Sequence, residues 1–453
     1  MSTPRRQHRR PPRDTSPNVT GLPPRRPRPR SRHRPPFPGA LIRLPAGRFR
    51  PRHCPNLHCR FYEPHPDWRY TLWGSYKAPS CRQLLPRFQC SHCRRTFTPR
   101  TFAATYWLHR FDLFALIAQA AVAGAGVRQI ARTFHVSHST VARHLTRAGR
   151  LCLVFHRRLL EKVPLREPVV IDGFETFEYS QYFPCHYNLA VGQESWFLYH
   201  FTDSPLRRKG TMTRAQRKRR GDLETALGRP DPKAVENGIF ELLRVVLDRT
   251  PLGTAGQIRD EVASPLPPSH PPSTPFSTPS SSPSPPIVRV HSDGHPAYER
   301  AVRRLRRTLD LPAAKGENPL LEHHQTPSTD PRTRANNLFP VNLADLLLRH
   351  SGADHRRETI AYDKRRQGGL ERLAVFAVWR NTIKWRRENH PGETAAMTAG
   401  VAKRRLRWAE VFARRQFPRE RELPGPWWDY YWRRVKTLAL GVRQTENRAV
   451  FAF

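Results

Sequence analysis

The chain has 453 residues and a formal net charge of +42, from 79 Lys plus Arg against 37 Asp plus Glu. This length accommodates two to four domains, and the excess of cations favours a polyanionic partner such as nucleic acid. No run of about 18 apolar residues is present to cross a membrane, and no apolar segment of a secretory signal opens the chain. We therefore expect no membrane partner.

The first segment, residues 1–50, holds 14 Arg, 12 Pro and a single acid, Asp14. Such a composition cannot bury enough apolar surface to fold alone. We expect a disordered basic Arg/Pro tail that contacts phosphates without sequence preference. The alternative is that this segment has no function.

Four of the seven cysteines form two close pairs, which are Cys54-x4-Cys59 and Cys90-x2-Cys93. An odd number of cysteines, four of them paired, indicates metal binding in a reducing compartment more than a disulfide framework. Two pairs on tight turns provide a tetrahedral S4 site for structural Zn2+, so residues 51–105 are predicted to be a zinc ribbon. The alternative is four unrelated thiols; Cys81 has no local partner.

Residues 126–148 have the pattern of two short helices joined by a turn. Ile130 and Phe134 form an apolar stripe on the first helix, Ser137 is a good N-cap for the second, and Leu145 buries that helix. A helix-turn-helix places its second helix in the major groove of DNA. The side chains predicted to face the DNA are His138, Ser139, Thr140 and Arg143. The alternative is an ordinary helical hairpin.

Short β runs begin after residue 166, and two of them end in an aspartate. Asp172 follows Val169-Val170-Ile171, and Asp293 follows the run 287–292. A carboxylate at the end of a buried run is costly unless it binds a cation, and two on adjacent strands make a site for divalent metal. Between them lies 264–286, where 18 of 23 residues are Ser or Pro; we expect a surface insertion.

The order of these features resembles insertion-sequence transposases of the DDE class. The resemblance covers roughly residues 51–390 and rests on Cys-Ser-His-Cys-Arg-Arg-Thr-Phe at 90–97, Ile-Asp at 171–172, His-Ser-Asp-Gly-His at 291–295 and Asn-Leu-Phe-Pro-Val-Asn at 337–342. It implies a multidomain α+β protein in which the zinc ribbon and helix-turn-helix precede an RNase H-like α/β catalytic domain with a mixed five-stranded sheet. In that family three acids hold two metal ions, Mg2+ or Mn2+.

Asp172 and Asp293 match the first two acids of the family, and the third is expected on a later helix. Asp345 is the preferred candidate, on a helix beginning after Pro340, with Arg349 one turn later to meet substrate phosphate. For Asp345 the alternative is a helix first-turn acid. Glu358 is the second candidate and Glu371 the third; their alternatives are a salt bridge and a solvated helix face.

The resemblance implies a transposase that binds terminal repeats of a mobile element and cuts and joins DNA strands by two-metal phosphoryl transfer. Its partners would be double-stranded DNA, at element ends and target, and further copies of itself in a synaptic complex. We expect a cytoplasmic, nucleoid-associated enzyme. Two rivals remain: a catalytically inactive sequence-specific DNA-binding protein derived from a transposase, and a nuclease on the same fold.

The predicted domain boundaries are 1–50 for the tail, 51–105 for the ribbon, 106–155 for the helix-turn-helix, 165–395 for the catalytic domain and 396–453 for a basic aromatic tail. The tryptophans of this last tail either stack on unpaired bases or close the domain as a hydrophobic cluster. His295 either orients substrate or is structural.

Overall fold

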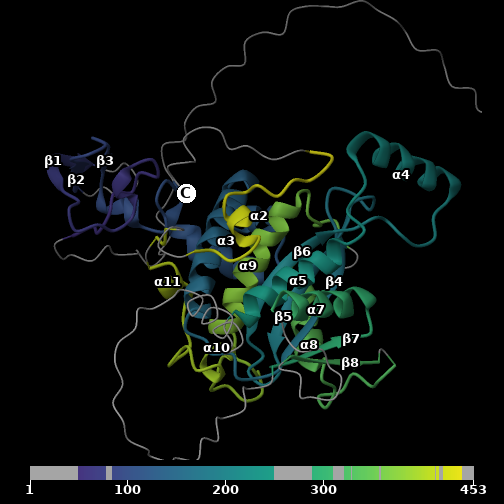
Figure 1. The fold of residues 1–453 in the computed structure, drawn as a ribbon. Coiled ribbons are helices and arrows are strands. Elements are labelled where there is room, and N and C mark those ends of the chain that lie inside the picture. Colours follow the sequence, from purple (N-terminus) through teal and green to yellow (C-terminus); the bar gives the residue numbers. More distant parts are fainter. Residues whose placement is uncertain are drawn as a thin grey trace, which may run out of the picture. The chain divides into compact units, whose positions relative to one another are not determined.

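The computed structural model describes residues 49–77, 84–248, 288–309, 321–327, 329–356, 359–413, 415–417 and 422–440 (Figure 1). Several predictions therefore fall outside the described residues. These are the basic tail up to residue 48, Cys81, the Ser/Pro-rich insertion 264–286 and Glu358.

The N-terminal module is a small antiparallel sheet built around the paired cysteines. Its strands pair in chain order, β1 (Tyr70–Lys77), β2 (Leu84–Cys90) and β3 (Thr96–Phe97), with 3-10 turns at η1 (Arg60–Tyr62) and η2 (Pro99–Phe102). Trp68 and Phe97 are buried against three of the four cysteines. Such a small core of its own is typical of modules that a cross-link or a bound metal stabilises.

A bundle of three helices follows, after the 3-10 turn η3 (Phe111–Leu113). Its members are α1 (Phe114–Val122), α2 (Val127–Thr133) and α3 (His138–Leu160). Ser137 caps α3 as predicted, because its side chain accepts a hydrogen bond of 3.2 Å from the backbone N–H of Thr140. His135, in the turn, has φ of +50°. Ile130, Val141 and Leu145 form the small core between the helices.

α3 belongs to two parts of the fold. Its first turns complete the three-helix bundle, whereas its residues from His144 to His156 are all buried. The second part packs along α9 (Arg366–Thr382), and Thr146 donates a 2.8 Å hydrogen bond to the carboxylate of Glu371 on that helix. One continuous helix therefore connects the helix-turn-helix to the main core.

The main core is a mixed five-stranded sheet, as predicted. Its strands are β4 (Val169–Phe177), β5 (Pro184–Gly192), β6 (Leu198–Pro205), β7 (Val288–Asp293) and β8 (Leu321–Thr326), in the order β6-β5-β4-β7-β8. β4 is antiparallel to β5 and β5 to β6, while β7 is parallel to both β4 and β8. The central β4, buried from Val169 to Ile171, thus carries a parallel neighbour on one side only.

Helices cover both faces of this sheet. α5 (Ala234–Leu247) approaches one face so closely at Gly238 that an added Cβ would lie 2.5 Å from the side-chain nitrogen of Asn188. On the other face the ring of His355 lies 5.6 Å from that of Tyr187. Because Tyr187 and Asn188 are consecutive on β5, their side chains point to opposite faces. α7 (Pro296–Thr308) packs beside α5, and α8 (Phe339–Ser351) packs against β4 and β5.

The C-terminal segment is part of the core. Its helices are α10 (Ala395–Thr398), α11 (Trp408–Val411) and α12 (Trp427–Tyr431). Trp427 is fully buried and its indole N–H donates to the carbonyl of Phe201 at 2.9 Å, while Trp408 stacks on Phe412. For these two tryptophans the hydrophobic-cluster interpretation holds and base stacking is wrong, because neither ring is accessible.

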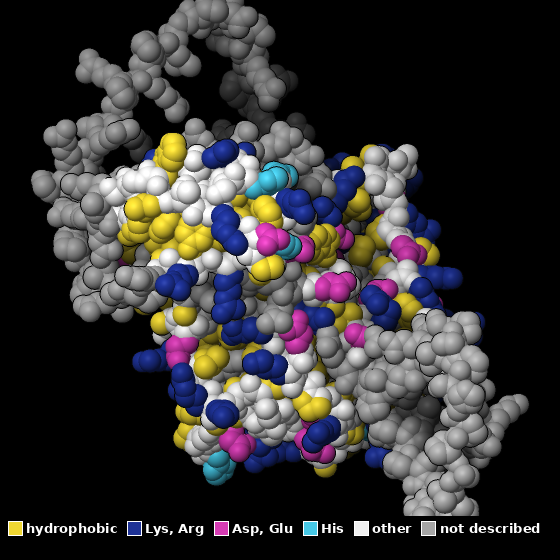
Figure 2. Space-filling view, turned by 60° about the vertical axis from the view of Figure 1, so that its left-hand side comes forward, with side chains coloured by type: hydrophobic (Ala, Val, Ile, Leu, Met, Phe, Trp, Pro, Cys, Tyr) yellow, Lys and Arg dark blue, Asp and Glu magenta, His cyan; other side chains and the backbone are white. Residues whose placement is uncertain are grey.

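One helix that was not predicted from the sequence stands apart from the sheet and the helical core in composition. α4 (Arg214–Leu227) lies between β6 and α5, where the pattern lacks any apolar periodicity. In the part of the chain that the structure describes, no helix combines the length and apolar character needed to cross a membrane. Figure 2 shows Lys and Arg side chains spread over the face in view, with fewer acids between them.

Candidate functional site

Asp172 lies where β4 leaves the apolar core. The preceding residues Val169 to Ile171 are fully buried, whereas Asp172 is half-buried. β4 pairs in parallel with β7, with Val170 opposite His291. Continuing that register by two residues brings Asp172 level with Asp293, the last residue of β7. Two carboxylates at the same level of adjacent parallel strands repel each other unless a proton or cation lies between them.

The pKa of Asp172 reports this environment. The pKa is raised to about 7, chiefly by burial and also by the negative charges of Asp293 and Asp345, against a lowering by the backbone N–H of Gly173 and by the hydroxyl of Tyr298. Asp345 reaches the site from α8, on a different part of the chain. Of the three predicted acids, Asp293 and Asp345 therefore each lie within electrostatic reach of Asp172. Their oxygens do not all approach within 4.8 Å of one another, as those of a closed metal cluster would.

Asp345 is held by Arg349, one turn later on α8. The guanidinium Nε donates to both carboxylate oxygens, at 3.1 and 3.3 Å, and its carbon lies 4.9 Å from the centre of the Phe174 ring. Phe174 is two residues after Asp172 on β4, so the arginine links α8 to the strand that carries the first acid. Asp345 is in the second turn of its helix, so the first-turn interpretation is wrong.

One side chain and one backbone N–H fix the aspartates. The hydroxyl of Tyr298 on α7 donates to Asp172 Oδ1 at 3.2 Å, and the backbone N–H of His295 donates to Asp293 Oδ1 at 2.9 Å. The His295 ring in turn accepts from the N–H of Ala297 at 3.2 Å and caps α7. This cap gives His295 a structural role at the start of α7. Tyr298 was missed, although its position five residues after Asp293, in the first turn of a helix, was a readable signal.

A buried network of charged residues lies behind this site. Donor atoms of Asp354, His355 and Asp363 come within 4.8 Å of one another, close enough to share a metal. However, Arg372 forms ion pairs with both carboxylates, at 2.8 Å to Asp354 and with close contact to Asp363. A cation already neutralises these acids, so the group is better described as an ion-pair network. It supports the sheet because His355 packs on the Phe174 and Tyr187 rings.

Glu371, the third candidate for the last acid, has a different role. It is 4% exposed, so the prediction of a solvated helix face is wrong. Its carboxylate accepts from Thr146 at 2.8 Å and from Arg433 Nε at 2.7 Å. These contacts join α9 to α3 and to the C-terminal segment. Glu371 therefore stabilises the junction between the helix-turn-helix and the main core.

The metal-free Asp172→Asn variant is expected to be more stable than the parent chain above about pH 7. The native state keeps the Asp172 proton up to a pKa of about 7, whereas in the unfolded chain the pKa is about 3.9. The stability linked to that proton is complete below about pH 4 and is lost as the pH rises to about 7. Asparagine has no proton to lose, so it escapes this loss.

Thermal melting without added divalent metal, followed from about pH 4 to about pH 8, measures the effect. The two midpoints should converge at the acidic end and separate at the alkaline end. A variant that is less stable than the parent throughout would show that Asp172 carries no electrostatic strain.

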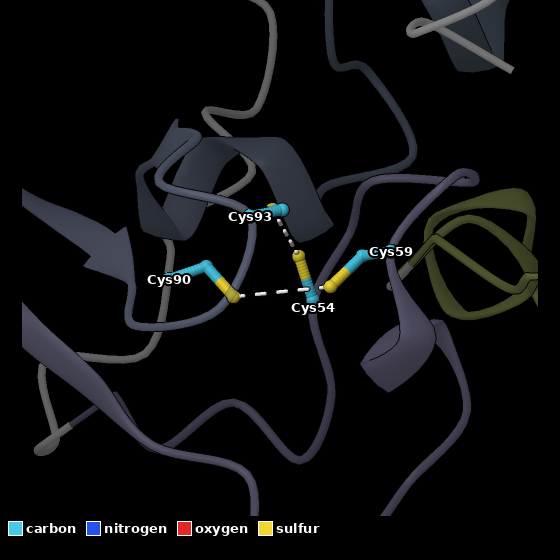
Figure 3. Close-up of side chains that lie close together, drawn as sticks. All are labelled: Cys54, Cys59, Cys90 and Cys93. Carbon is cyan, nitrogen blue, oxygen red and sulfur yellow. Dashed lines mark hydrogen bonds between the residues drawn. The ribbon is translucent and has the colours of Figure 1, made fainter.

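The four predicted cysteines come together in the N-terminal module (Figure 3). Cys54 and Cys59 come from the loop before η1, Cys90 ends β2, and Cys93 lies in the following turn. All four sulfurs are within 4.8 Å of one another, with Cys54 and Cys93 3.6 Å apart and Cys59 and Cys90 3.9 Å apart. Four sulfurs about 2.3 Å from one zinc ion are about 3.8 Å apart, so the cluster can bind zinc.

Hydrogen bonds to sulfur support this geometry. The indole N–H of Trp68 donates to Cys90 Sγ at 3.3 Å, and the backbone N–H of Phe61 donates to Cys59 Sγ at 3.4 Å. Burial raises the pKa of Cys90. The hydrogen bonds from the Trp68 indole and from the backbone N–H groups of His92 and Cys93 outweigh burial and lower the pKa to about 7. Burial raises the pKa of Cys54 strongly. A cation is required to stabilise four thiolates there together.

The helix-turn-helix presents a polar surface at the start of α3. His138, Ser139 and Arg143 are exposed, and Thr140 is half-buried with its hydroxyl 2.8 Å from that of Ser137. On the preceding helix Arg128 and Arg132 are exposed too. His144 points inward instead, where its ring bonds the carbonyls of Thr140 and Arg110, each at 2.8 Å. The arrangement suits a helix entering the major groove, flanked by cations for the phosphates.

Comparison with known proteins agrees with this part of the molecule. A family model described as a helix-turn-helix domain matches residues 115–148, from α1 to the first half of α3. No curated protein matches the chain. The helix-turn-helix prediction is thus confirmed, and a domain of this kind indicates DNA as the partner.

Replacing Arg143 by Ala is expected to weaken specific DNA binding by about 1–3 kcal/mol while changing non-specific binding less, because an exposed arginine there can read a base edge. Binding to the cognate site and to random DNA is measured in the same salt. Arg132→Ala, on the helix that crosses the backbone, is the matched control and should weaken both equally. Equal losses for Arg143→Ala would make it a phosphate contact only.

Proposed function

We propose that this protein is a DNA transposase of the DDE class, which binds the terminal repeats of a mobile element and cuts and joins DNA strands. The observation that carries the proposal is the electrostatic coupling of Asp172 with Asp293 and Asp345 at the ends of adjacent strands and on a later helix. The confirmed helix-turn-helix, a type found in transposase DNA-binding regions, supports the DNA substrate.

The topology of the main sheet supports an RNase H-like catalytic domain. In the family that the sequence resembles, three strands and a helix precede the fourth strand, and the acids lie on strand one, after strand four and on a later helix. Here β4, β5, β6 and α5 precede β7, and the order β6-β5-β4-β7-β8 sets the first and fourth strands side by side. Asp172, Asp293 and Asp345 occupy the corresponding positions.

The donor set fits a hard divalent cation such as Mg2+ or Mn2+. Three carboxylates, one with its pKa raised to about 7, offer oxygen ligands and an unbalanced negative charge. When bound, the metal supplies Lewis acidity that activates a water or 3′-hydroxyl and stabilises the leaving oxygen. The chain's own residues orient the acids: Tyr298 donates a hydrogen bond to Asp172, and Arg349 donates to Asp345. In the proposed reaction Arg349 would also contact a phosphate of the DNA substrate.

The N-terminal module would act as a zinc ribbon that extends the DNA-binding surface. Zinc bound by Cys54, Cys59, Cys90 and Cys93 would hold the module folded rather than take part in the reaction. Since two element ends must be paired before strand transfer, we further propose that the enzyme works as a homo-oligomer on chromosomal DNA in the cytoplasm.

Incubating the purified chain with labelled duplexes taken from both sides of its gene, in Mg2+, tests the proposal. A transposase produces strand cleavage and joins the labelled end to a second duplex. Cleavage without joining indicates a nuclease on the same fold. Specific binding with no cleavage indicates an inactive DNA-binding relative of transposases, and either of these last outcomes contradicts the proposal.

A further inference from the structure

The helix α4 and the loop before it are strongly basic. Residues 207–220 contain eight Lys or Arg and no acid. Three of these, Arg214, Arg217 and Lys218, have the i, i+3, i+4 spacing that sets side chains on one face of a helix. Like charges at this spacing repel each other and destabilise the helix. An anionic partner would offset this repulsion, so the face is expected to bind one.

No apolar face explains the position of α4 in the fold. None of its residues is buried, although it is 14 residues long. A helix that is polar all round needs other support, and short helices are marginal in water. The support is local: Thr213 and Gln216 form a reciprocal capping box, with hydrogen bonds of 3.0 and 3.2 Å, and Gly228 with φ of +86° ends the helix.

The second half of α4 is fastened to the end of β6. Arg207, two residues after that strand, donates two hydrogen bonds to the carboxylate of Glu224, at 2.8 and 3.0 Å. Arg220 donates to the carbonyl of Arg208 at 3.0 Å, and the Arg208 guanidinium lies 4.7 Å from the centre of the Tyr182 ring. The helix is thus anchored at Glu224 and Arg220, and its first turns extend from that anchor.

The first turns present four cations, three of which have no acidic partner among the described residues. Arg214, Arg217 and Arg219 are exposed, and within the described part of the chain no ion pair involves them. Lys218 pairs with Asp222 only at the surface, at 3.2 Å. An anionic membrane is a poor partner, because interfacial helices need an apolar face that α4 lacks. A regular row of phosphates satisfies all these cations without any apolar contact.

We infer that α4 is a second DNA-contacting element, which binds the phosphate backbone of a duplex without reading its sequence. The inference rests on the DNA-binding part of the proposed function and is independent of catalysis. Arg214, Arg217 and Lys218 are the contacting residues, and the anchor through Glu224 keeps them fixed relative to the sheet. The partner is duplex DNA of any sequence, bound in addition to the site that the helix-turn-helix recognises.

The test is the salt dependence of binding by the full chain to a random-sequence duplex. The variant carries Arg214→Gln, Arg217→Gln and Lys218→Gln, which remove three charges and keep good helix formers. Because each lost phosphate contact reduces the slope of log affinity against log salt by about 0.9, the slope should fall by roughly 3, with affinity at low salt reduced roughly tenfold or more. The control carries Arg303→Gln, Arg307→Gln and Lys403→Gln, the same change in net charge at other exposed positions.

An unchanged slope in the α4 variant, or an equal fall in the control, would overturn the inference. Circular dichroism and thermal melting should be unchanged, since no buried side chain is altered. Strand cleavage with saturating DNA separates the two proposals. If α4 contacts DNA but the chain is not a transposase, the salt slope of the α4 variant falls while neither the parent nor the variant cleaves DNA. If only the α4 inference fails, the parent and the variant both cleave DNA and their salt slopes agree.

Discussion

Replacing Asp172 or Asp293 by Asn is expected to abolish DNA strand cleavage and joining while leaving DNA binding nearly intact. The amide keeps the shape of the side chain but loses the charge that holds a divalent cation. Removing a metal ligand from a two-metal centre costs several kcal/mol of transition-state stabilisation, so the rate should fall by roughly a thousandfold or more. Cleavage of a labelled duplex and its gel retardation, measured on the same preparations, separate chemistry from binding.

The same result is expected for Asp345→Asn, but not for Glu371→Gln. Glu371 holds Thr146 and Arg433 at a buried junction, so its replacement should lower the melting temperature before it affects chemistry. Asp67→Asn is the matched control, because Asp67 is an exposed carboxylate whose side chain is 77% accessible. Full cleavage by Asp172→Asn would show that the reaction does not depend on this centre.

The second large effect is expected at the cysteine cluster. The purified chain should carry about one tightly bound zinc, and Cys90→Ser together with Cys93→Ser should remove it and unfold the N-terminal module. The module's own core is small, and structural zinc contributes about 10–16 kcal/mol of folding free energy in comparable peptides. Metal analysis counts the zinc, and the fluorescence of Trp68, whose indole touches Cys90, should change with it.

A double variant at two cysteines outside the cluster, Cys152→Ala and Cys185→Ala, is the control. Both are buried in the main core, so their loss can lower overall stability but should leave zinc content unchanged. Full zinc occupancy after Cys90→Ser and Cys93→Ser would exclude four-sulfur binding at this place.

Much of the arrangement was predictable because it depends on local chemistry. Ser137 caps α3 since a serine before an apolar-periodic run can accept a backbone N–H. The two cysteine pairs lie on turns whose spacing already suits one metal. The level of Asp172 beside Asp293 follows from apolar runs that end in a carboxylate, whereas the mixed sheet was expected only from the resemblance to DDE transposases.

The features that were missed depend on contacts between distant segments. Tyr298 reaches Asp172 from α7, and only its place five residues after Asp293 marks it in the sequence. Arg372 pairs with Asp354 and Asp363 inside the core, and no local pattern marks that contact. α4 was not predicted because helix prediction from sequence relies on apolar periodicity, and this helix has no buried residue. The C-terminal tryptophans look like surface aromatics in a basic tail, and only the folded chain puts Trp427 against Phe201.

The continuous helix α3 gives the two halves of the proposed mechanism a physical connection. Its first turns present the DNA-facing side chains, and its later turns pack on α9 in the main core. A helix that continues from the helix-turn-helix into the main core cannot rotate freely against it. DNA recognised by the helix-turn-helix would therefore be held at a defined position relative to the strand ends that carry the acids.

The most direct measurement of the central claim is Mn2+ binding by the zinc-loaded chain, followed by electron paramagnetic resonance of free Mn2+. If Asp172, Asp293 and Asp345 share a divalent metal site, the parent chain binds Mn2+ with an affinity that rises with pH up to about 7, as the Asp172 proton is displaced. Asp172→Asn and Asp293→Asn should each weaken that binding by roughly a hundredfold, whereas Asp67→Asn should not. Equal Mn2+ binding by the parent chain and by the Asp172→Asn and Asp293→Asn variants would contradict the account.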